Sequence, residues 1–162
     1  MKKIRVLPIK KLCALNVQRQ IPAGSAAVLC TLNQIPTEQL AGINYIHVPF
    51  IDVLDKKRPD AFTEEKARVI RQFVDELPEE IMLFFCCDSG QSRSTALAAA
   101  FKRYLGQDER VIWDDVRYHP NRLVYGLQCK ACGRKSSWLR TRLLSLHNRL
   151  LFKKQIRNGE RN

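Results

Sequence analysis

The sequence contains few of the residues that mark specialised chains. Glycine and proline occur only seven times each among 162 residues, and the chain has no internal repeat or low-complexity segment. Six cysteines at irregular spacings are too few for a disulfide-stapled secreted fold of this length, so a reducing, cytoplasmic setting is expected. Together with a hydrophobic content of 45%, these features predict one packed globular domain.

Long hydrophobic runs and acidic residues are also scarce. The longest apolar run, IMLFFCC, falls far short of the roughly 20 residues that cross a bilayer, so no transmembrane segment is expected. Charged residues interrupt the N-terminal apolar stretches, which argues against a signal peptide. The 16 Asp and Glu residues against 28 Lys and Arg leave a formal charge of +12. This excess favours anionic partners, such as phosphorylated substrates, nucleic acid or acidic lipid surfaces, without choosing among them.

The hydrophobic pattern alternates short strands with helices. Residues 81–87 form a continuous apolar run, as in a strand buried on both faces of a mainly parallel sheet. Thr63 is the predicted N-cap of the clearest amphipathic helix, which Pro78 ends. The pattern predicts an α/β fold with a central, mostly parallel sheet flanked by helices. Further strands are expected over residues 2–9, 26–32 and 45–50, and further helices over 94–105, 108–118, after Pro120 and over 136–157.

A short polar loop after the central strand carries the clearest chemistry. Cys87 and Arg93 stand at its two ends, and an alanine-rich helix follows. The peptide N–H groups of such a loop would point inward at a phosphate, while Gly90 allows the tight curvature and the helix adds its positive end. The planar fork of Arg93 can bind two phosphate oxygens, with Cys87 beneath the phosphorus for in-line attack. The same positive field favours the thiolate of Cys87, and Ser94 can donate a hydrogen bond to it.

The stretch CDSGQSRS resembles the signature loop of the protein-tyrosine and dual-specificity phosphatase superfamily, which reads cysteine, five residues, arginine, then serine or threonine. The resemblance extends over about residues 45–128 and is strongest to compact microbial members. It implies that Cys87 is the nucleophile, that Arg93 binds phosphate and stabilises the transition state, and that Ser94 stabilises the thiolate. The implied phosphate-binding residues are Asp88, Ser89, Gly90, Gln91, Ser92 and Arg93.

Two flanking segments resemble the same superfamily. HVPFIDV is similar to the segment that carries the general acid, which maps this role onto Asp52, with Asp55 and Asp60 as alternatives in the same loop. RYHPNRLVYGLQ resembles the segment whose asparagine, here Asn121, braces the phosphate loop. The implied mechanism has two steps through a cysteinyl-phosphate intermediate, and it requires neither a metal nor another cofactor.

One residue departs from the superfamily pattern. Cys86 occupies the position before the nucleophile, where these phosphatases usually have a histidine that helps to hold the thiolate. We interpret Cys86 mainly as a small apolar strand residue. Reversible oxidation of Cys87 is also expected, with Cys86 or Cys30 as resolving partner.

The remaining cysteines and the histidines support no metal site. Cys129 and Cys132 form a CxxC motif without a second ligand pair at zinc-finger spacing, so they are interpreted as core thiols. The three histidines are scattered along the chain and are assigned structural or surface roles. They are His47, His119 and His147.

The C-terminal region has a composition of its own. Ten basic residues and a single acidic one, Glu160, lie between residues 130 and 162. We predict a phosphatase-like catalytic domain over residues 1–135, with a basic amphipathic helix and tail over residues 136–162 docked on it. The alternative is a helix that binds a membrane, a nucleic acid or another anionic partner. Its leucines at helical spacing are Leu139, Leu143, Leu146 and Leu150.

The leading hypothesis is a phosphomonoester hydrolase that acts on phosphorylated protein, most simply phosphotyrosine, or on small aryl phosphates. The signature loop has no lysine or histidine to hold extra phosphates, which argues against specialists for polyphosphoinositides or RNA 5′-triphosphates. One alternative is a catalytically weak module that binds phosphate or nucleic acid through the same loop and basic tail. Another is a sulfur-transfer or arsenate-reducing enzyme, which fits Arg93, Ser94 and the Pro-Asn segment less well.

Overall fold

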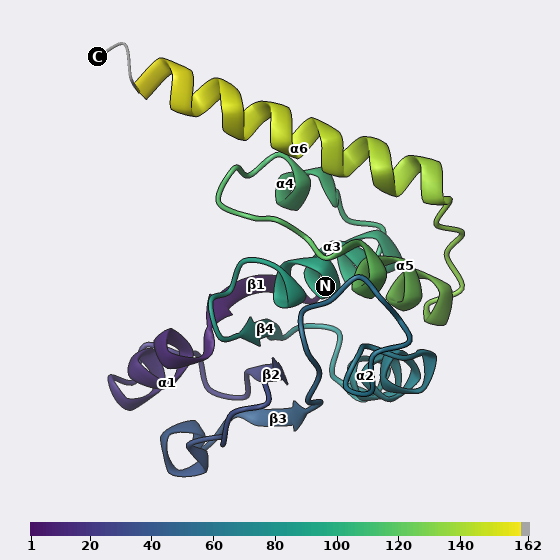
Figure 1. The fold of residues 1–162 in the computed structure, drawn as a ribbon. Helices are drawn as coiled ribbons and strands as arrows, with labels where there is room; N and C mark the ends of the chain where they lie inside the picture. The colour runs from purple at the N-terminus through teal and green to yellow at the C-terminus, as the bar shows by residue number, and fades with distance from the viewer. Residues whose placement is uncertain (160–162) are drawn as a thin grey trace.

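A four-stranded parallel sheet forms the centre of the molecule in the computed structural model, which describes residues 1–159 (Figure 1). The strand order is β1-β4-β2-β3, and every neighbouring pair is parallel. Strand β4 lies inside the sheet and is buried along nearly its whole length, as its uninterrupted apolar sequence predicts. The predicted α/β fold with a parallel sheet is confirmed. The strands are β1 (Lys3–Pro8), β2 (Ala26–Cys30), β3 (Asn44–His47) and β4 (Met82–Cys87).

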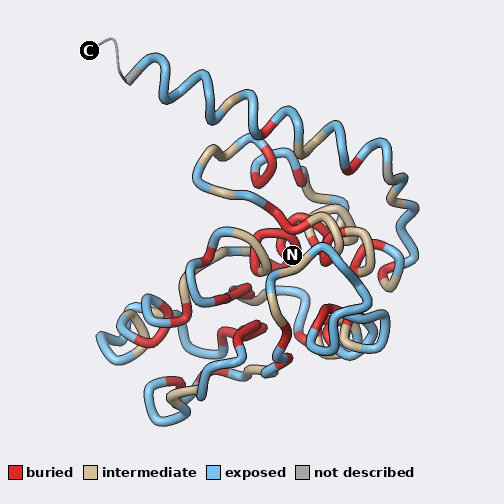
Figure 2. Tube along the Cα trace, in the orientation of Figure 1, coloured by how far each residue is buried: buried red, intermediate tan, exposed pale blue. Residues whose placement is uncertain are grey.

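Helices cover both faces of the sheet and create two apolar cores. On one face, α1 (Ile9–Val17) and the short 3-10 helix η1 (Thr37–Leu40) pack over a smaller cluster that includes Leu29 and Phe84. On the other face lie α2 (Glu64–Glu76), α3 (Arg93–Tyr104) and α5 (Arg122–Ala131), over a larger cluster that includes Phe85 and Phe101. Figure 2 shows the buried residues concentrated in the strands and in the helix faces that meet them.

Local sequence explains why the predicted helices α2 and α3 form. The hydroxyl of Thr63 accepts a hydrogen bond from the Lys66 N–H, so this residue is the N-cap of α2 as predicted. Helix α3 carries a run of alanines, Ala98, Ala99 and Ala100, all fully buried. Because alanine side chains are short, the α3 backbone can approach the sheet closely, which brings the start of the helix to the end of β4.

Several boundaries differ from the sequence prediction. A strand was expected through residue 9, but β1 ends at Pro8 and α1, which was not predicted, begins at Ile9 without a side-chain cap. The predicted helix over residues 108–118 is reduced to α4 (Arg110–Trp113), because the Asp115 side chain accepts the Arg117 N–H and forms a turn instead. Strand β3 ends at His47, two residues before Pro49, which has no N–H for a ladder.

The last helix, α6 (Trp138–Gly159), crosses the molecule beside α4 and α5 (Figure 1). Most of its length is exposed (Figure 2). The exposed side chains include the predicted leucines Leu139, Leu143, Leu146 and Leu150. Residues 160–162 of the predicted tail, with Glu160, lie outside the described residues. Within residues 1–159, no helix has the length and apolar character needed to cross a membrane.

Candidate active site

The predicted phosphate loop connects the carboxyl end of β4 to the first turn of α3. Gly90, in the middle of this loop, is buried and has φ +69°, which side chains with a Cβ rarely adopt. A Cβ at this position would lie 2.8 Å from the Pro8 nitrogen and 2.9 Å from the Pro8 Cδ. The loop therefore packs directly against the end of β1, and glycine is required there on both conformational and steric grounds.

The candidate nucleophile lies at the base of this loop. The Sγ of Cys87 is 3.0 Å from the Oγ of Ser94, and both residues are buried. Ser94 belongs to the first turn of α3, where the helix presents its positive end. The Cys87 sulfur therefore has a hydroxyl partner from the first turn of α3.

The carbonyl groups at the end of the loop are engaged with the protein behind it. The Gln91 carbonyl accepts the His119 N–H at 2.8 Å, and the Ser92 carbonyl accepts the Asn121 N–H at 3.3 Å and the Ala96 N–H at 3.0 Å. Within residues 1–159, the peptide N–H groups of residues 89–92 donate no hydrogen bond. The loop thus leaves a row of donors for an anion, which is the arrangement expected of a phosphate cradle.

Arg93 is held across the mouth of the loop by two acceptors. One terminal nitrogen donates to the Phe50 carbonyl at 2.9 Å, and the other donates to the Asp88 carboxylate at 2.5 Å. The Nε of Arg93 is buried and has no hydrogen-bond partner among the described residues. The Nε and one terminal nitrogen form the edge of the guanidinium that can bind two phosphate oxygens. On this edge the Nε has no partner among the described residues, and the terminal nitrogen donates to the Asp88 carboxylate.

The Asp88 carboxylate is itself firmly placed. Thr31 donates its hydroxyl to Asp88 at 2.5 Å, and the side-chain amide of Asn33 donates to the same oxygen at 3.0 Å. Burial opposes ionisation, but the hydrogen bonds from Thr31, Arg93 and Asn33 outweigh it and hold the pKa of Asp88 below its ordinary value. Asp88 was expected to contribute only as part of the loop, and its side chain is a second functional feature.

Thr31 and Asn33 were not predicted as site residues. They follow β2, whose carboxyl end lies beside that of β4 because the two strands are parallel neighbours. Polar residues just after a strand in a parallel sheet commonly line the site at that edge. Their position after β2 is the sequence signal that could have identified them. Their contacts with Asp88 could not be predicted, because more than 50 residues of chain separate them from it.

Asp52 lies against the loop, as the resemblance implied. One of its carboxylate oxygens accepts the Ser92 hydroxyl at 2.9 Å and the Asn121 side-chain amide at 2.7 Å. The alternative residues make other contacts: the Asp55 carboxylate accepts the Lys57 N–H in its own turn, and Asp60 accepts the Ile51 N–H through its main-chain carbonyl. Of the three candidate acids, only Asp52 has a hydrogen bond to the signature loop within the described residues.

Asn121 connects three segments of the site. Its side-chain oxygen caps α5 by accepting the N–H groups of Leu123 and Val124, while its side-chain amide donates to Asp52 and to the Val53 carbonyl. Its own N–H donates to the loop at Ser92. These contacts connect the segment that contains Asp52 to the loop.

The other cysteines differ sharply in their relation to Cys87. Cys30 is the register partner of Cys87 on β2 and belongs to the same core cluster, whereas Cys86 belongs to the cluster on the opposite face of the sheet. Burial raises the pKa of both Cys30 and Cys86, and Coulombic repulsion from Cys87 acts in the same direction. Cys129 and Cys132 are buried in the larger core, and burial raises the pKa of Cys129 to about 11.

Each of the three histidines has a different contact. His47 contacts the Thr31 carbonyl, His119 contacts Asn148, and His147 pairs with Asp114. Over residues 1–159, no three of the His, Cys, Asp and Glu side chains are grouped so that they could hold a metal ion.

Three solved structures illustrate what this chain is similar to. The core catalytic domain of the PP-IP phosphatase SIW14 from S. cerevisiae aligns with 13% identity and a TM-score of 0.48, covering 97% of this chain and 86% of that one. Tk-PTP in its active form aligns with 16% identity and a TM-score of 0.45, covering 94% and 91%. The Yvh1 phosphatase domain from Chaetomium thermophilum aligns with 11% identity and a TM-score of 0.46, covering 90% and 88%. No protein-family model and no curated protein sequence matches the chain.

Proposed function

We propose that this protein is a cysteine-dependent phosphomonoester hydrolase. The observation that carries the proposal is the position of the Cys87 sulfur, 3.0 Å from Ser94 at the base of a loop whose N–H groups at residues 89–92 have no partner within the described chain. Arg93 stands at the end of this loop and Asp52 lies against it. A nucleophile, a phosphate cradle, a cation and an acid therefore meet at one edge of the sheet.

The reaction proceeds in two balanced steps. In the first, the Cys87 thiolate attacks phosphorus, the bond from phosphorus to the leaving oxygen breaks, and Asp52 gives its proton to that oxygen. In the second, water attacks phosphorus, Asp52 accepts a proton from it, and the bond from phosphorus to sulfur breaks to restore the thiolate. The positive charge needed in both steps comes from Arg93 and from the loop N–H groups, so no metal is required.

Substrate binding involves an exchange of partners at Arg93. In the free protein this guanidinium is paired with Asp88 and has an unpartnered Nε. A phosphate in the loop offers two oxygens to the Nε and the adjacent terminal nitrogen, which is the bidentate geometry that guanidinium groups prefer. Binding therefore requires the Arg93–Asp88 pair to loosen, and the dianion replaces the carboxylate.

The proposed substrates are phosphotyrosine in proteins and small aryl phosphates, with phosphoserine and phosphothreonine as further candidates. A second candidate function is a catalytically weak phosphate- or nucleic-acid-binding module, in which α6 engages an anionic partner. The cysteine that replaces the usual histidine before Cys87 and the net charge of +12 support this alternative. The six free cysteines support action in a reducing compartment such as the cytoplasm.

The proposal is tested by phosphate release from an aryl phosphate in the presence of a chelator. Wild type is compared with Cys87→Ser, Arg93→Ala and Asp52→Asn, with Asp55→Asn as a matched control for the acid. Turnover lost in the first two variants, reduced about a hundredfold or more in the third and kept in the control would support the assigned roles. Activity that survives Cys87→Ser would contradict the proposal. Phosphate binding without turnover in any form would favour the binding module.

A further inference from the structure

A groove beside the candidate active site is lined by residues that the reaction does not use. Its volume is about 330 Å³. Its lining residues include Asp52 and Ser92 of the candidate site, Arg122 from α5 and Arg149 from α6. A second hollow of similar volume continues from it, shares both arginines and adds Arg142. The two hollows therefore join residues of the candidate active site to three arginines of α5 and α6.

The charges of this groove are poorly balanced. Asp52 is the only carboxylate among the lining residues of the two hollows. Neither Arg122 nor Arg149 has a hydrogen-bond or ion-pair partner within residues 1–159. Guanidinium groups that share one concave surface repel each other, and an anion with several oxygens between them would relieve this repulsion while accepting bidentate hydrogen bonds.

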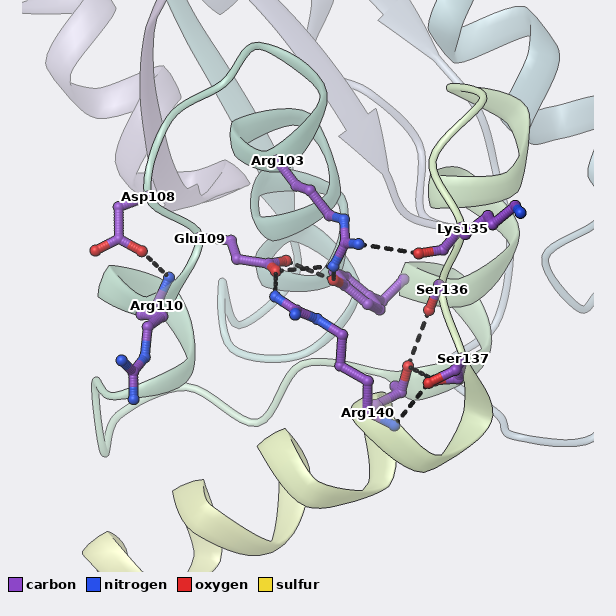
Figure 3. Close-up of polar contacts among 10 residues, drawn as sticks. Arg103, Asp108, Glu109, Arg110, Lys135, Ser136, Ser137 and Arg140 are labelled. Atoms are coloured by element: carbon purple, nitrogen blue, oxygen red, sulfur yellow. Dashed lines mark hydrogen bonds and ion pairs between the residues drawn. The ribbon is translucent and has the colours of Figure 1, made fainter.

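Two contacts hold α6 where it contributes to the groove. At its start, Arg140 donates to the buried carboxylate of Glu109 at 2.6 Å, which also accepts from Arg103 and from the Tyr125 hydroxyl (Figure 3). Further along α6, the buried Asn148 donates its side-chain amide to the Trp113 and Asp115 carbonyls, at 2.9 and 3.2 Å.

These anchors fix the register of the helix. Ser145 lies three residues before Asn148 and Arg149 directly follows it, and both line the groove. Their placement follows from buried hydrogen bonds rather than from a flexible surface arrangement.

One residue beside the groove has an unsatisfied buried donor. Trp113 lines the groove and is completely buried, and its indole N–H has no hydrogen-bond partner among the described residues. Buried donors in folded proteins are nearly always paired with protein, water or ligand atoms. Because this nitrogen is shielded from solvent, it is not itself a contact for a ligand in the groove.

We infer that this groove binds a second phosphate of the substrate, held by Arg122 and Arg149 beside the phosphate that is hydrolysed. This inference rests on the proposed function and specifies its substrate class as molecules with two phosphate groups. The sequence argued against such substrates because the loop itself has no extra basic residue. The structure supplies the missing charge from α5 and α6, two segments that lie outside the loop.

The test compares doubly and singly phosphorylated substrates within each variant. Phenylene bisphosphate is measured against phenyl phosphate, and a doubly phosphorylated peptide against its singly phosphorylated form. Wild type is expected to favour the doubly phosphorylated member by about tenfold or more in kcat/KM, since charge-assisted hydrogen bonds to a desolvated phosphate are of that order. A larger preference in the phenyl pair would identify the substrate as a small molecule. A larger preference in the peptide pair would identify it as a phosphorylated protein.

Variants distinguish an effect of the groove arginines from an effect of the overall positive charge. Arg149→Ala and Arg122→Ala should each reduce the preference about tenfold, and Arg149→Lys should retain part of it. Arg157→Ala, a matched loss of one exposed α6 charge outside the groove, should leave the preference unchanged. Because the ratio is taken within one variant, partial unfolding affects both substrates equally. A wild type without preference, or an equal effect of Arg157→Ala, would overturn the inference.

A binding measurement distinguishes failure of the groove from failure of the proposed function. Cys87→Ser is titrated with phenylene bisphosphate and phenyl phosphate by calorimetry, alone and combined with Arg149→Ala. Tighter bisphosphate binding that depends on Arg149, without turnover in wild type, would support the groove and contradict the hydrolase. Turnover in wild type with equal affinity for both ligands would support the hydrolase and contradict the groove.

Discussion

At the scale of single residues, Asp88 and Arg93 determine the resting state of the candidate site. The Arg93 guanidinium needs an acceptor in a partly buried position, and Asp88 provides one when phosphate is absent. Thr31 and Asn33 hold the carboxylate in place, so the ion pair is organised before substrate arrives. The same arrangement keeps Arg93 oriented and places a negative charge where a dianion must bind.

Replacing Asp88 with asparagine should improve substrate affinity. The amide keeps an oxygen for Thr31 and Asn33 but removes the charge that competes for Arg93, so KM for an aryl phosphate should fall about threefold to tenfold. Steady-state kinetics at pH 7 would measure this change. Asp75→Asn, which removes another arginine-paired carboxylate far along α2, is the control and should leave KM unchanged. An increase in KM would mean that Asp88 serves mainly to orient Arg93.

Gly90 offers a second test at this scale. Gly90→Ala should disrupt the loop, because the new Cβ meets the Pro8 backbone at 2.8 Å in addition to the cost of φ +69°. Gly42→Ala is a matched control, since Gly42 has φ +81° but no atom within 4 Å of the added Cβ. Denaturant unfolding should show a cost of about 1 kcal/mol for the control and clearly more for Gly90→Ala, with loss of turnover. Equal costs would indicate that the loop shifts freely.

At the scale of elements, the buried Glu109 joins three helices. It accepts hydrogen bonds from Arg103 of α3, Tyr125 of α5 and Arg140 of α6 (Figure 3). Burial raises the pKa of Tyr125, and its hydrogen bond to Glu109 acts in the same direction, so the phenol stays protonated and donates. The position of α6, and with it the groove of the further inference, depends on this junction.

Glu109→Gln should therefore destabilise the protein and loosen α6. Neutralising the carboxylate leaves Arg103 and Arg140 facing each other without a counter-charge, at a cost of about 3 kcal/mol in the free energy of unfolding. Glu64→Gln removes an exposed pair with Lys130 and should have a much smaller effect, because solvent screens that pair. Urea unfolding would compare the two variants, and limited proteolysis would report on α6. Similar small costs for both would show that the junction contributes little.

At the scale of the whole molecule, the pH dependence of stability should record the state of Asp88. Its pKa is lower in the folded protein than in an unfolded chain, so ionisation stabilises the fold above the unfolded value of about 4. This contribution is lost as pH falls through the folded pKa. Wild type should exceed Asp88→Asn in stability at pH 7 by no more than about 1 kcal/mol, since the carboxylate is nearly half exposed. The difference should shrink as pH falls below about 4, and a difference that grows on acidification would contradict this reading.

The distribution of charge also becomes clear only at this scale. The basic side chains of α6 lie on a helix that has no acidic residue within Trp138–Gly159, and part of this helix borders the candidate site. A substrate with several negative charges would therefore approach through a positive field. The net charge of +12 predicted an anionic partner, and the groove of the further inference is where we expect such a partner to bind.

Much of the fold and the centre of the candidate site could be predicted because their determinants are local. The apolar run before Cys87, the cap at Thr63 and the spacing from Cys87 to Arg93 each lie within a few consecutive residues. Hydrophobic periodicity and turn chemistry act over the same range, so they can be read without tertiary contacts. Helix α1 was missed because it follows β1 directly, with neither a side-chain cap nor a polar linker.

The sequence by itself determined the strand, loop and helix that bring Cys87, Ser94 and Arg93 together, because their geometry follows from adjacent residues. Tertiary structure alone decided which distant side chains complete the site. Asp88 meets Thr31 only because β2 and β4 are parallel neighbours, and Arg122 and Arg149 line one groove only because α6 is anchored beside α5. Such contacts depend on packing between segments far apart in the chain, and no local pattern encodes them.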